Sequence, residues 1–291
     1  MKKFTLLSFL LILVLAGSAQ SIKPRLVFQP GQSLQINREV KKTIAQQAMG
    51  QAIEMNVEGA AVHVYKVTNH TDDNSTLHHE PKSIKFNFEG MGQKRPFDSN
   101  NEKDMQGPLG NPIKETLAKT YDMIIDPSGK VLLVQPEKLA ATEMDERLKI
   151  ITAMLNDILD VVEPPSKGGN SFFKVLPDTS VTKGDSWTET FENKDGKFTN
   201  NYTLSEITDS TLVVDLAGSS STVSKLEIMG GMELTTSMNN KTTGKIIVDK
   251  ATGLVRSKSL QTESSGTTQG MGNETPVTSK TSILSTVTAL Q

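Results

Sequence analysis

The sequence contains no cysteine among its 291 residues. Disulfide bonds and thiolate metal sites are therefore excluded, and so is a lipid anchor on a cysteine directly after a signal peptide. Aromatic residues make up only 5% of the chain, which leaves few side chains for the interfacial girdles of an outer-membrane barrel. We expect a protein that does not span a membrane and is stabilised by packing and backbone pairing.

The chain also lacks a strong charge of either sign. It has 31 basic and 33 acidic residues, a formal net charge of −2 and no basic block. Proteins that bind nucleic acid cluster lysine and arginine to neutralise phosphates. The charge pattern therefore predicts no nucleic-acid partner.

The first nineteen residues have the pattern of a removable export signal. Two lysines precede an apolar run from Phe4 to Leu15, and small residues then lead up to Ala19. The run is too short to cross a hydrocarbon core of about 30 Å. We expect cleavage after Ala19 and a mature chain that is periplasmic or extracellular and is not a lipoprotein.

Most of the remaining chain alternates apolar and polar residues, as β-strands do. In a first stretch, Leu34, Ile36 and Val40 share one parity, which two cations, Arg38 and Lys42, interrupt. The same alternation recurs over residues 53–67, 84–88, 121–125, 212–216 and 232–234. Serine and threonine fill many intervening positions, which is typical of strands with one wet face. The sequence predicts a mainly β (β-rich α+β) fold of long, antiparallel strands in curled sheets.

Two helical patterns interrupt the strands. Asn111-Pro112 offers an N-cap followed by a proline at the first helical position. A longer apolar stripe runs from about Glu137 to Val162 and predicts a bridging helix near 137–162. We expect an N-terminal β half over 20–135, a helix and linker over 136–170, and a C-terminal β half over 171–291.

The two halves have similar first and last turns. Each half opens on a Gly-polar-Ser sequence, at Gly31 and at Gly184. Near the end of each half, an apolar strand ends in an aspartate, Asp126 or Asp249, and a glycine follows in the same turn. Aspartate accepts hydrogen bonds from the next backbone N–H groups, and glycine supplies a positive φ. The paired turns predict an internal repeat of two related curled sheets, although hairpin tips also resemble one another in general.

Possible metal ligands gather in one stretch of the N-terminal half. They are His70, Asp72, His78, His79 and Glu80. Their spacing matches no metal motif, and adjacent histidines on a strand point to opposite faces. The stretch from Thr68 to Glu80 is rich in polar residues, so we favour a solvated loop and keep a metal site as the weaker alternative. His63, on the apolar parity of its strand, is predicted to be buried or to face a groove.

With these features, the chain resembles a family of exported, β-rich proteins of unknown function from Gram-negative Bacteroidota. The resemblance rests on the Met49-Gly50-Gln51 hairpin, the strand from Phe86 to Ser99, the turn Lys183–Trp187 and the turn Asp249–Gly253. It covers most of the mature chain. The family has no assigned activity, so the resemblance implies a β-rich fold and a periplasmic location only.

Catalytic groups are scarce in this exported chain. We therefore expect a non-enzymatic envelope protein, without a cofactor, that binds an apolar or amphipathic ligand such as a lipid on a concave sheet. The candidate groove residues are Met55, Tyr65, Phe86, Phe88 and Met123, although core packing also explains each of them. A structural module that binds another envelope protein is an alternative, because long edge strands can pair with a partner strand. A metal-dependent hydrolase built on the ligands between His70 and Glu80 is the weakest of the three.

Overall fold

The structure is a computed structural model. It describes residues 21–48, 51–90, 92–139, 153–159, 162–193, 195–228, 232–270 and 272–290. The expected signal peptide over 1–19 and most of the expected helix over 137–162 lie outside these residues. Of that helix, the structure describes the short α5 (Asn156–Leu159), whereas 137–139 are not helical.

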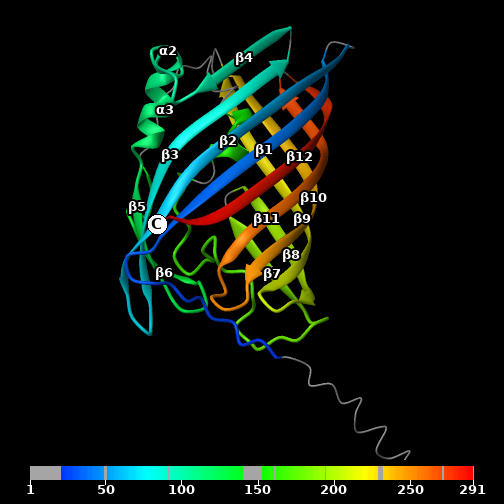
Figure 1. Ribbon diagram of the computed structural model, residues 1–291. Helices are drawn as coiled ribbons and strands as arrows, with labels where there is room; N and C mark the ends of the chain where they lie inside the picture. Colours follow the sequence, from blue (N-terminus) through cyan, green and yellow to red (C-terminus); the bar gives the residue numbers. More distant parts are fainter. Residues whose placement is uncertain are drawn as a thin grey trace, which may run out of the picture.

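Twelve antiparallel strands form one continuous sheet (Figure 1). The N-terminal half contributes β1 (Ser33–Ala48), β2 (Gln51–His70), β3 (Ser75–Gly90), β4 (Gln93–Asp98), β5 (Tyr121–Ile125) and β6 (Val131–Gln135). The C-terminal half contributes β7 (Ser186–Asn193), β8 (Gly196–Ile207), β9 (Thr211–Ile228), β10 (Met232–Asp249), β11 (Val255–Gly270) and β12 (Asn273–Leu290). The spatial order is β6-β5-β3-β2-β1-β12-β11-β10-β9-β8-β7, with β4 on the same edge of β3 as β5. The prediction of a mainly β fold with long antiparallel strands is confirmed.

The two halves do not form two separate sheets. The first strand, β1, pairs with the last, β12, from Ser33 opposite Leu290 to Gln46 opposite Val277. Alternation along a strand shows which residues share a face, but it does not show which strand lies beside it. The expectation of two sheets is therefore corrected to one sheet that both halves build.

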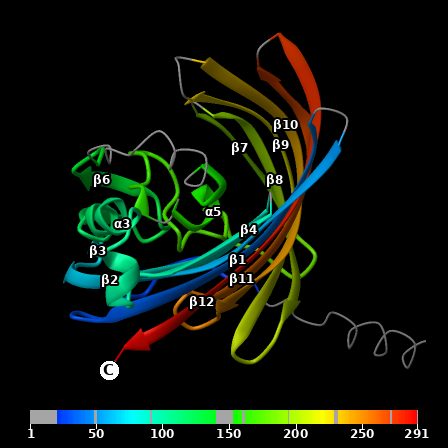
Figure 2. The same cartoon turned by 90° about the horizontal axis from the view of Figure 1, so that it is seen from above.

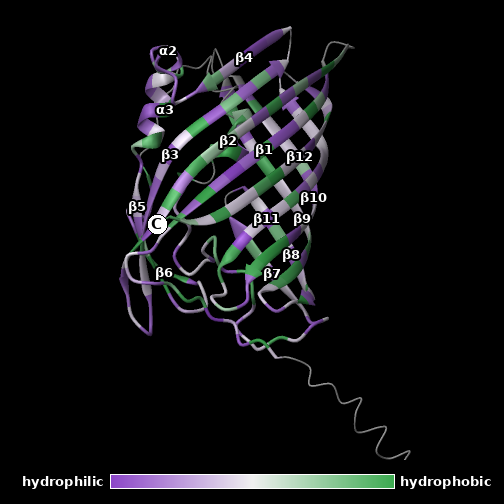
Figure 3. Cartoon of the chain, viewed as in Figure 1, coloured by the Kyte–Doolittle hydropathy of each residue, from purple (hydrophilic) through white to green (hydrophobic). Residues whose placement is uncertain are grey.

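The sheet curls around the remaining elements. The helix α3 (Gly110–Leu117) packs on β3, and α5 packs on β1 and β2, within the curve of the sheet (Figure 2). We call this concave side, which carries the buried Val40 and Val57, the inner face. Every second side chain of a strand points to the inner face. In strands such as β2, hydrophobic and hydrophilic residues alternate with the same period (Figure 3). Leu34, Ile36 and Val40 share the inner face, as their parity predicts.

The two cations that interrupt the apolar parity of β1 contact α5. Lys42 Nζ lies 2.6 Å from Asp157 Oδ2, and Arg38 Nε donates to the Asp157 carbonyl oxygen at 2.8 Å. Both groups of the Lys42–Asp157 pair are largely withdrawn from water. The cations therefore stand at the inner face because α5 brings a carboxylate and a carbonyl group to them.

The helix α3 begins earlier than its predicted N-cap. Its N-cap is Leu109, without a capping side chain, and Asn111 lies inside the first turn. Pro112 is also in this first turn, where a missing N–H costs no intrahelical bond. Ile113 is buried in the cluster with Phe86 and Phe88 of β3. A second short helix, α2 (Glu102–Met105), precedes it and is capped by the Asn101 side chain.

The opening turns of the two halves share one hydrogen-bond arrangement. In each turn, the backbone N–H of the glycine donates to the carbonyl oxygen of a partner residue on the second strand of that half. The carbonyl oxygen of the residue after the glycine accepts from the backbone N–H of the same partner residue. The partners are Val67 for Gly31-Gln32 and Leu204 for Gly184-Asp185. Both glycines have positive φ, +77° and +95°. The two opening turns therefore have the same geometry, although the strands that follow them belong to one continuous sheet.

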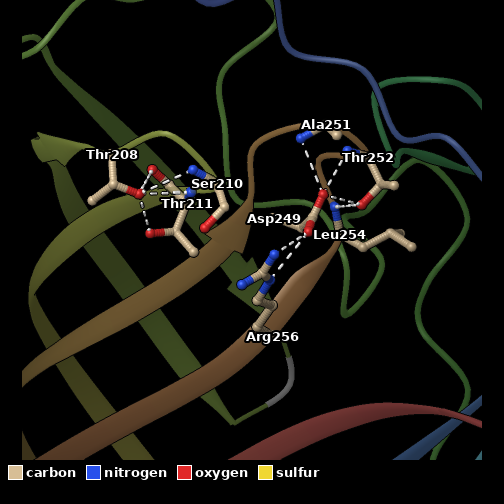
Figure 4. A network of polar contacts seen from close by, with 8 residues as sticks. All are labelled: Thr208, Ser210, Thr211, Asp249, Ala251, Thr252, Leu254 and Arg256. Carbon is tan, nitrogen blue, oxygen red and sulfur yellow. Dashed lines mark hydrogen bonds and ion pairs between the residues drawn. The ribbon is translucent and has the colours of Figure 1, made fainter.

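The closing turns are held by their aspartates. Asp249 Oδ1 accepts from the N–H groups of Ala251 at 3.0 Å and Thr252 at 2.8 Å, and from the Thr252 hydroxyl (Figure 4). Asp249 Oδ2 accepts from Arg256. Burial raises the pKa of Asp249, but the hydrogen bonds from Arg256 and Thr252 outweigh it and hold this pKa below its ordinary value. Asp126 accepts hydrogen bonds from its own turn in the same manner.

Replacing this turn aspartate is expected to destabilise the protein. Asp249→Ala should lower the free energy of unfolding by about 2 kcal/mol, because three turn donors lose their acceptor. Asp249→Asn keeps the Oδ1 acceptor and loses mainly the ion pair with Arg256, so its loss should be about 1 kcal/mol or less. Urea unfolding measures both, with the exposed Asp209→Ala as control. Equal stability of Asp249→Ala and Asp209→Ala would refute this role.

A candidate ligand-binding face

The five residues expected to line a groove lie in the core. Met55, Tyr65, Phe86, Phe88 and Met123 are at most 6% exposed. Met55, Phe86 and Phe88 belong to the cluster with α3 and α5. Tyr65 and Met123 pack with Phe28 and Phe173. The inner face of the N-terminal half is therefore filled by the chain itself, and these residues present no groove surface.

The five expected metal ligands have separate neighbours. His78, His79 and Glu80 lie within β3, so the predicted solvated loop is shorter than expected and comprises only 71–74. The nearest polar partners are Ser75 for His70, Arg25 for Asp72, Asp122 for His78, His63 for His79 and Lys82 for Glu80. In the described part of the chain, no three histidine, aspartate or glutamate side chains are placed to hold a metal ion.

His79 belongs instead to a buried polar cluster in the core. His63 Nδ1 lies 2.9 Å from His79 Nε2, and the Tyr65 and Tyr121 hydroxyls lie 2.9 Å apart. His63 Nε2 and His79 Nδ1 are buried and have no hydrogen-bond partner among the described residues. Burial, chiefly, lowers the pKa of each histidine to about 3 and raises the pKa of Tyr65 to about 12. All four side chains are therefore neutral near pH 7.

The inner face of the C-terminal half is less completely covered. The segment that includes Val175 and Val181 packs on Leu204 and its neighbours at one end of β8–β11. Beyond that end, the inner-face side chains of these strands are only partly buried, except for Leu216, which is buried. In Figure 2, α3 and α5 lie over the N-terminal strands of the curve. This open part of the inner face is where the sheet offers side chains to a ligand.

Two stacked aromatic pairs stand on this open inner face, on β7 and β8. Trp187 stacks on Tyr202 with ring centroids 5.6 Å apart, and Phe191 stacks on Phe198 at 4.8 Å. Phe191 is 48% exposed, although it shares a face with the buried Leu204. We call these four residues the aromatic platform. Burial raises the pKa of Tyr202 to about 12, and the nearby Glu189 carboxylate adds to this.

Strand register arranges the open inner face in alternating rows. One row is largely apolar and consists of Tyr202, Leu216, Gly244, Leu260 and Ile283. Within it, Leu216 is buried and Ile283 packs against the core cluster that includes Ile158, so Tyr202, Gly244 and Leu260 are its more open members. The next row is mostly polar and consists of Asn200, Gly218, Thr242, Thr262 and Thr281, of which Thr281 is buried. Within it, the Thr242 and Thr262 hydroxyls lie 2.9 Å apart. The face therefore places rings and methyl groups directly beside hydroxyl and amide groups.

A partly buried lysine lies next to the apolar row. Lys258 Nζ donates to the Phe172 carbonyl at 2.6 Å and lies 4.3 Å from the centre of the Phe172 ring. Burial, with a further contribution from Arg38, lowers the pKa of Lys258 to about 8. Because Phe172 covers it, Lys258 fixes the segment that joins the halves and does not itself present a cation to the open face.

The aromatic platform was not anticipated from the sequence. Its four aromatic residues fall within 187–202, in a chain with only 5% aromatic residues, and alternation places them on one face. That local enrichment was the available signal. None of the described helices is long and apolar enough to cross a membrane.

The solved structures that match this chain are distant from it in sequence and have TM-scores below 0.5. A structure of lipovitellin, concerned with its lipid–protein interactions, has 9% identity and a TM-score of 0.46, over 90% of this chain and 26% of that chain. An outer membrane channel from Pseudomonas putida F1 has 6% identity and a TM-score of 0.23, over 94% and 98% of the two chains. The β domain of the Bordetella autotransporter BrkA has 8% identity and a TM-score of 0.20, over 89% and 99%. The chain thus spans about a quarter of the lipovitellin chain.

Sequence comparison finds a matching protein family but no matching curated protein. Among curated proteins, none matches this chain. A protein-family model matches residues 72–255, which is more than half of the chain and includes strands of both halves. The chain therefore belongs to the family that this model describes as a family of unknown function (DUF6263).

Proposed function

We propose that this protein is an exported, non-enzymatic envelope protein that binds an amphipathic ligand on the open inner face of its C-terminal half. The observation that carries the proposal is the aromatic platform, whose Phe191 remains 48% exposed on a concave, otherwise partly buried face. An exposed ring on such a face stabilises a complex when a ligand removes it from water.

The neighbouring rows favour an amphipathic ligand over a purely apolar one. A hydrocarbon that covered the polar row would desolvate Asn200, Thr242 and Thr262 without hydrogen-bonding them, which costs free energy. A ligand with an apolar part on the rings and polar atoms on the hydroxyl row satisfies both.

The filled N-terminal half restricts the site to the C-terminal strands. Burial of Met55, Tyr65, Phe86, Phe88 and Met123 means that a ligand there would have to displace α3, α5 or the segment around Phe173. The open inner face of the C-terminal half requires no such displacement.

Ligand binding is expected to change the emission of Trp187, the one tryptophan of the chain. Lysophosphatidylcholine, titrated below its micellar concentration, should give a saturable blue shift. Phe191→Ser should weaken this binding by about tenfold, because one ring no longer leaves water. The matched control is Leu284→Ser, which removes a 40% exposed side chain from the opposite face of the sheet.

Two results would contradict this proposal. One is a titration that leaves Trp187 emission unchanged, or one in which Leu284→Ser weakens binding as much as Phe191→Ser does. The other comes from native mass spectrometry with solvent extraction of protein purified from a periplasm. That measurement should show a small amphipathic adduct, and a reproducibly bare polypeptide would count against the proposal.

A second candidate function, a protein-binding envelope module, is favoured by the ends of the sheet. Leu132 and Leu133 on the edge strand β6 are 44% and 41% exposed, and β7 ends the other side of the sheet. A partner strand that added to such an edge would gain backbone hydrogen bonds and cover these side chains. The same native spectrum distinguishes the two functions, because a protein partner adds a polypeptide mass.

A further inference from the structure

A groove of about 800 Å³ crosses β8 to β12 and β1. The alternation of β1 places its residues Thr43 and Ala45 on the face opposite Val40, so the groove lies on the outer face of the sheet. Serine, threonine, asparagine, lysine and glutamate line it, and Ala45 is the one aliphatic residue among its described lining. This site is distinct from the open inner face in position and in chemistry.

Strand register explains the shape of the groove. One wall is a row of side chains on six neighbouring strands: Thr43, Lys280, Glu263, Lys241, Ser219 and Thr199. The other wall is the row two residues further along each strand, which ends at Lys197 on β8. Between the rows lie Ser220, Asn240, Ser264 and Ser279, whose side chains point to the inner face by alternation, so that their backbone forms the floor of the groove. Hydroxyl and amide groups therefore recur about every 5 Å, the spacing of neighbouring strands.

The lysines of the groove are regularly spaced and only partly neutralised. They stand on β8, β10 and β12, every second strand, so neighbouring lysines are about 10 Å apart across the sheet. Lys280 lies 3.2 Å from Glu263, but both side chains are largely exposed, which makes this pair weak. Lys197 and Lys241 have no ion-pair partner among the described residues. The groove is thus positive in a chain whose net charge is −2.

We propose that this outer groove binds a linear, acidic polysaccharide. Its hydroxyl and amide groups suit the many donors and acceptors of sugar rings, and its lysines suit carboxylates that recur along the chain. The near absence of apolar side chains disfavours a lipid tail. Nucleic acid carries a charge on every nucleotide and rewards many more cations than three. The proposal goes beyond the inner-face ligand and does not depend on it.

The test uses the mature full-length chain and a hyaluronan octasaccharide, which carries one carboxylate in each disaccharide. Calorimetry at low ionic strength should show binding of the acid form and at least about tenfold weaker binding of its methyl ester, which has the same sugars without the charge. The double variant Lys197→Gln with Lys241→Gln should weaken binding of the acid form by about tenfold as well. Exposed substitutions of this kind leave folding almost unchanged.

The control is the double variant Lys225→Gln with Lys245→Gln. It removes the same charge from lysines of the same face on β9 and β10 that do not line the groove and that pair with Glu233 and Asp215. This control and Phe191→Ser should both retain full affinity for the octasaccharide. The proposal is overturned by no binding of the acid form, by equal binding of the ester, or by an equal loss in the control. Equally tight binding of a thymidine oligonucleotide would also overturn it, because the groove would then be a general polyanion surface.

Discussion

Phe173→Ala is expected to lower the free energy of unfolding by about 4 kcal/mol, the loss typical of a fully buried phenylalanine. Phe173 is 0% exposed and makes edge contacts with Phe28 at 5.6 Å, Tyr65 at 5.4 Å and Phe172 at 5.4 Å between ring centroids. It stands in the irregular segment before β7, so its cluster joins that segment to strands of the N-terminal half. An alanine there leaves a cavity that several surrounding elements would have to close.

Urea unfolding followed by circular dichroism measures this loss. The matched control is Phe191→Ala, the same substitution at a half-exposed ring, which should cost about 1 kcal/mol or less. If Phe173→Ala fails to fold, Phe173→Leu provides a milder test and should lose about 1 to 2 kcal/mol. A loss for Phe173→Ala no greater than that for Phe191→Ala would show that this segment does not anchor the core.

The faces of the strands could be read from the sequence because they depend on neighbouring residues alone. Leu34, Ile36 and Val40 share the inner face because side chains alternate with a period of two, whatever lies opposite. The pairing of β1 with β12 depends on residues more than two hundred positions apart, and no local pattern encodes it. Arg38 and Lys42 interrupt the apolar parity of β1, and the local sequence gives no reason for this, because Asp157 contacts them only in the folded chain.

The candidate ligand-binding face also depends on tertiary neighbours that the local sequence does not show. Parity correctly assigned Met55 and Phe86 to an apolar face, but it could not show that α3 and α5 cover that face. Phe191 has the same local pattern and remains exposed because β7 lies at the far end of the sheet. An apolar inner-face residue thus becomes core or binding surface according to the segment that packs against it, which is a tertiary property.

Lowering the pH from 7 to 5 is expected to destabilise the protein by about 4 kcal/mol through His63 and His79. Burial is the main cause that lowers the pKa of both histidines to about 3. Repulsion from Arg38 lowers the pKa of His63 further, and repulsion from His63 and His78 lowers that of His79. In the unfolded chain their pKa values return to about 6.5. Their contribution to stability is therefore complete above pH 6.5 and is lost as the pH falls toward 3. Between pH 6.5 and pH 3 the unfolded chain binds a proton at each histidine and the folded chain does not. At pH 5 this difference lowers the free energy of unfolding by about 2 kcal/mol for each histidine.

The geometry explains why the folded cluster does not accept these protons. In the neutral pair, one of His63 Nδ1 and His79 Nε2 donates and the other accepts across 2.9 Å. Protonating both rings would place two N–H groups against each other. It would also leave His63 Nε2 and His79 Nδ1 as charged donors without an acceptor among the described residues. Tyr65 and Tyr121 are neutral and their hydroxyl groups form a hydrogen bond with each other, so they bring no negative charge that would compensate the imidazolium groups.

Unfolding free energies measured between pH 7 and pH 5 isolate this effect, because ordinary carboxyl groups titrate near pH 4. The double variant His63→Leu with His79→Leu replaces both partners by apolar groups of similar size, and it should be stable enough to study and nearly insensitive to pH in this window. The control His70→Leu with His78→Leu removes two less buried imidazoles and should keep the acid sensitivity of the parent chain. If the parent chain is equally stable at pH 7 and pH 5, the buried pair must accept its protons in the folded state, and the cluster would then have to open to water without unfolding.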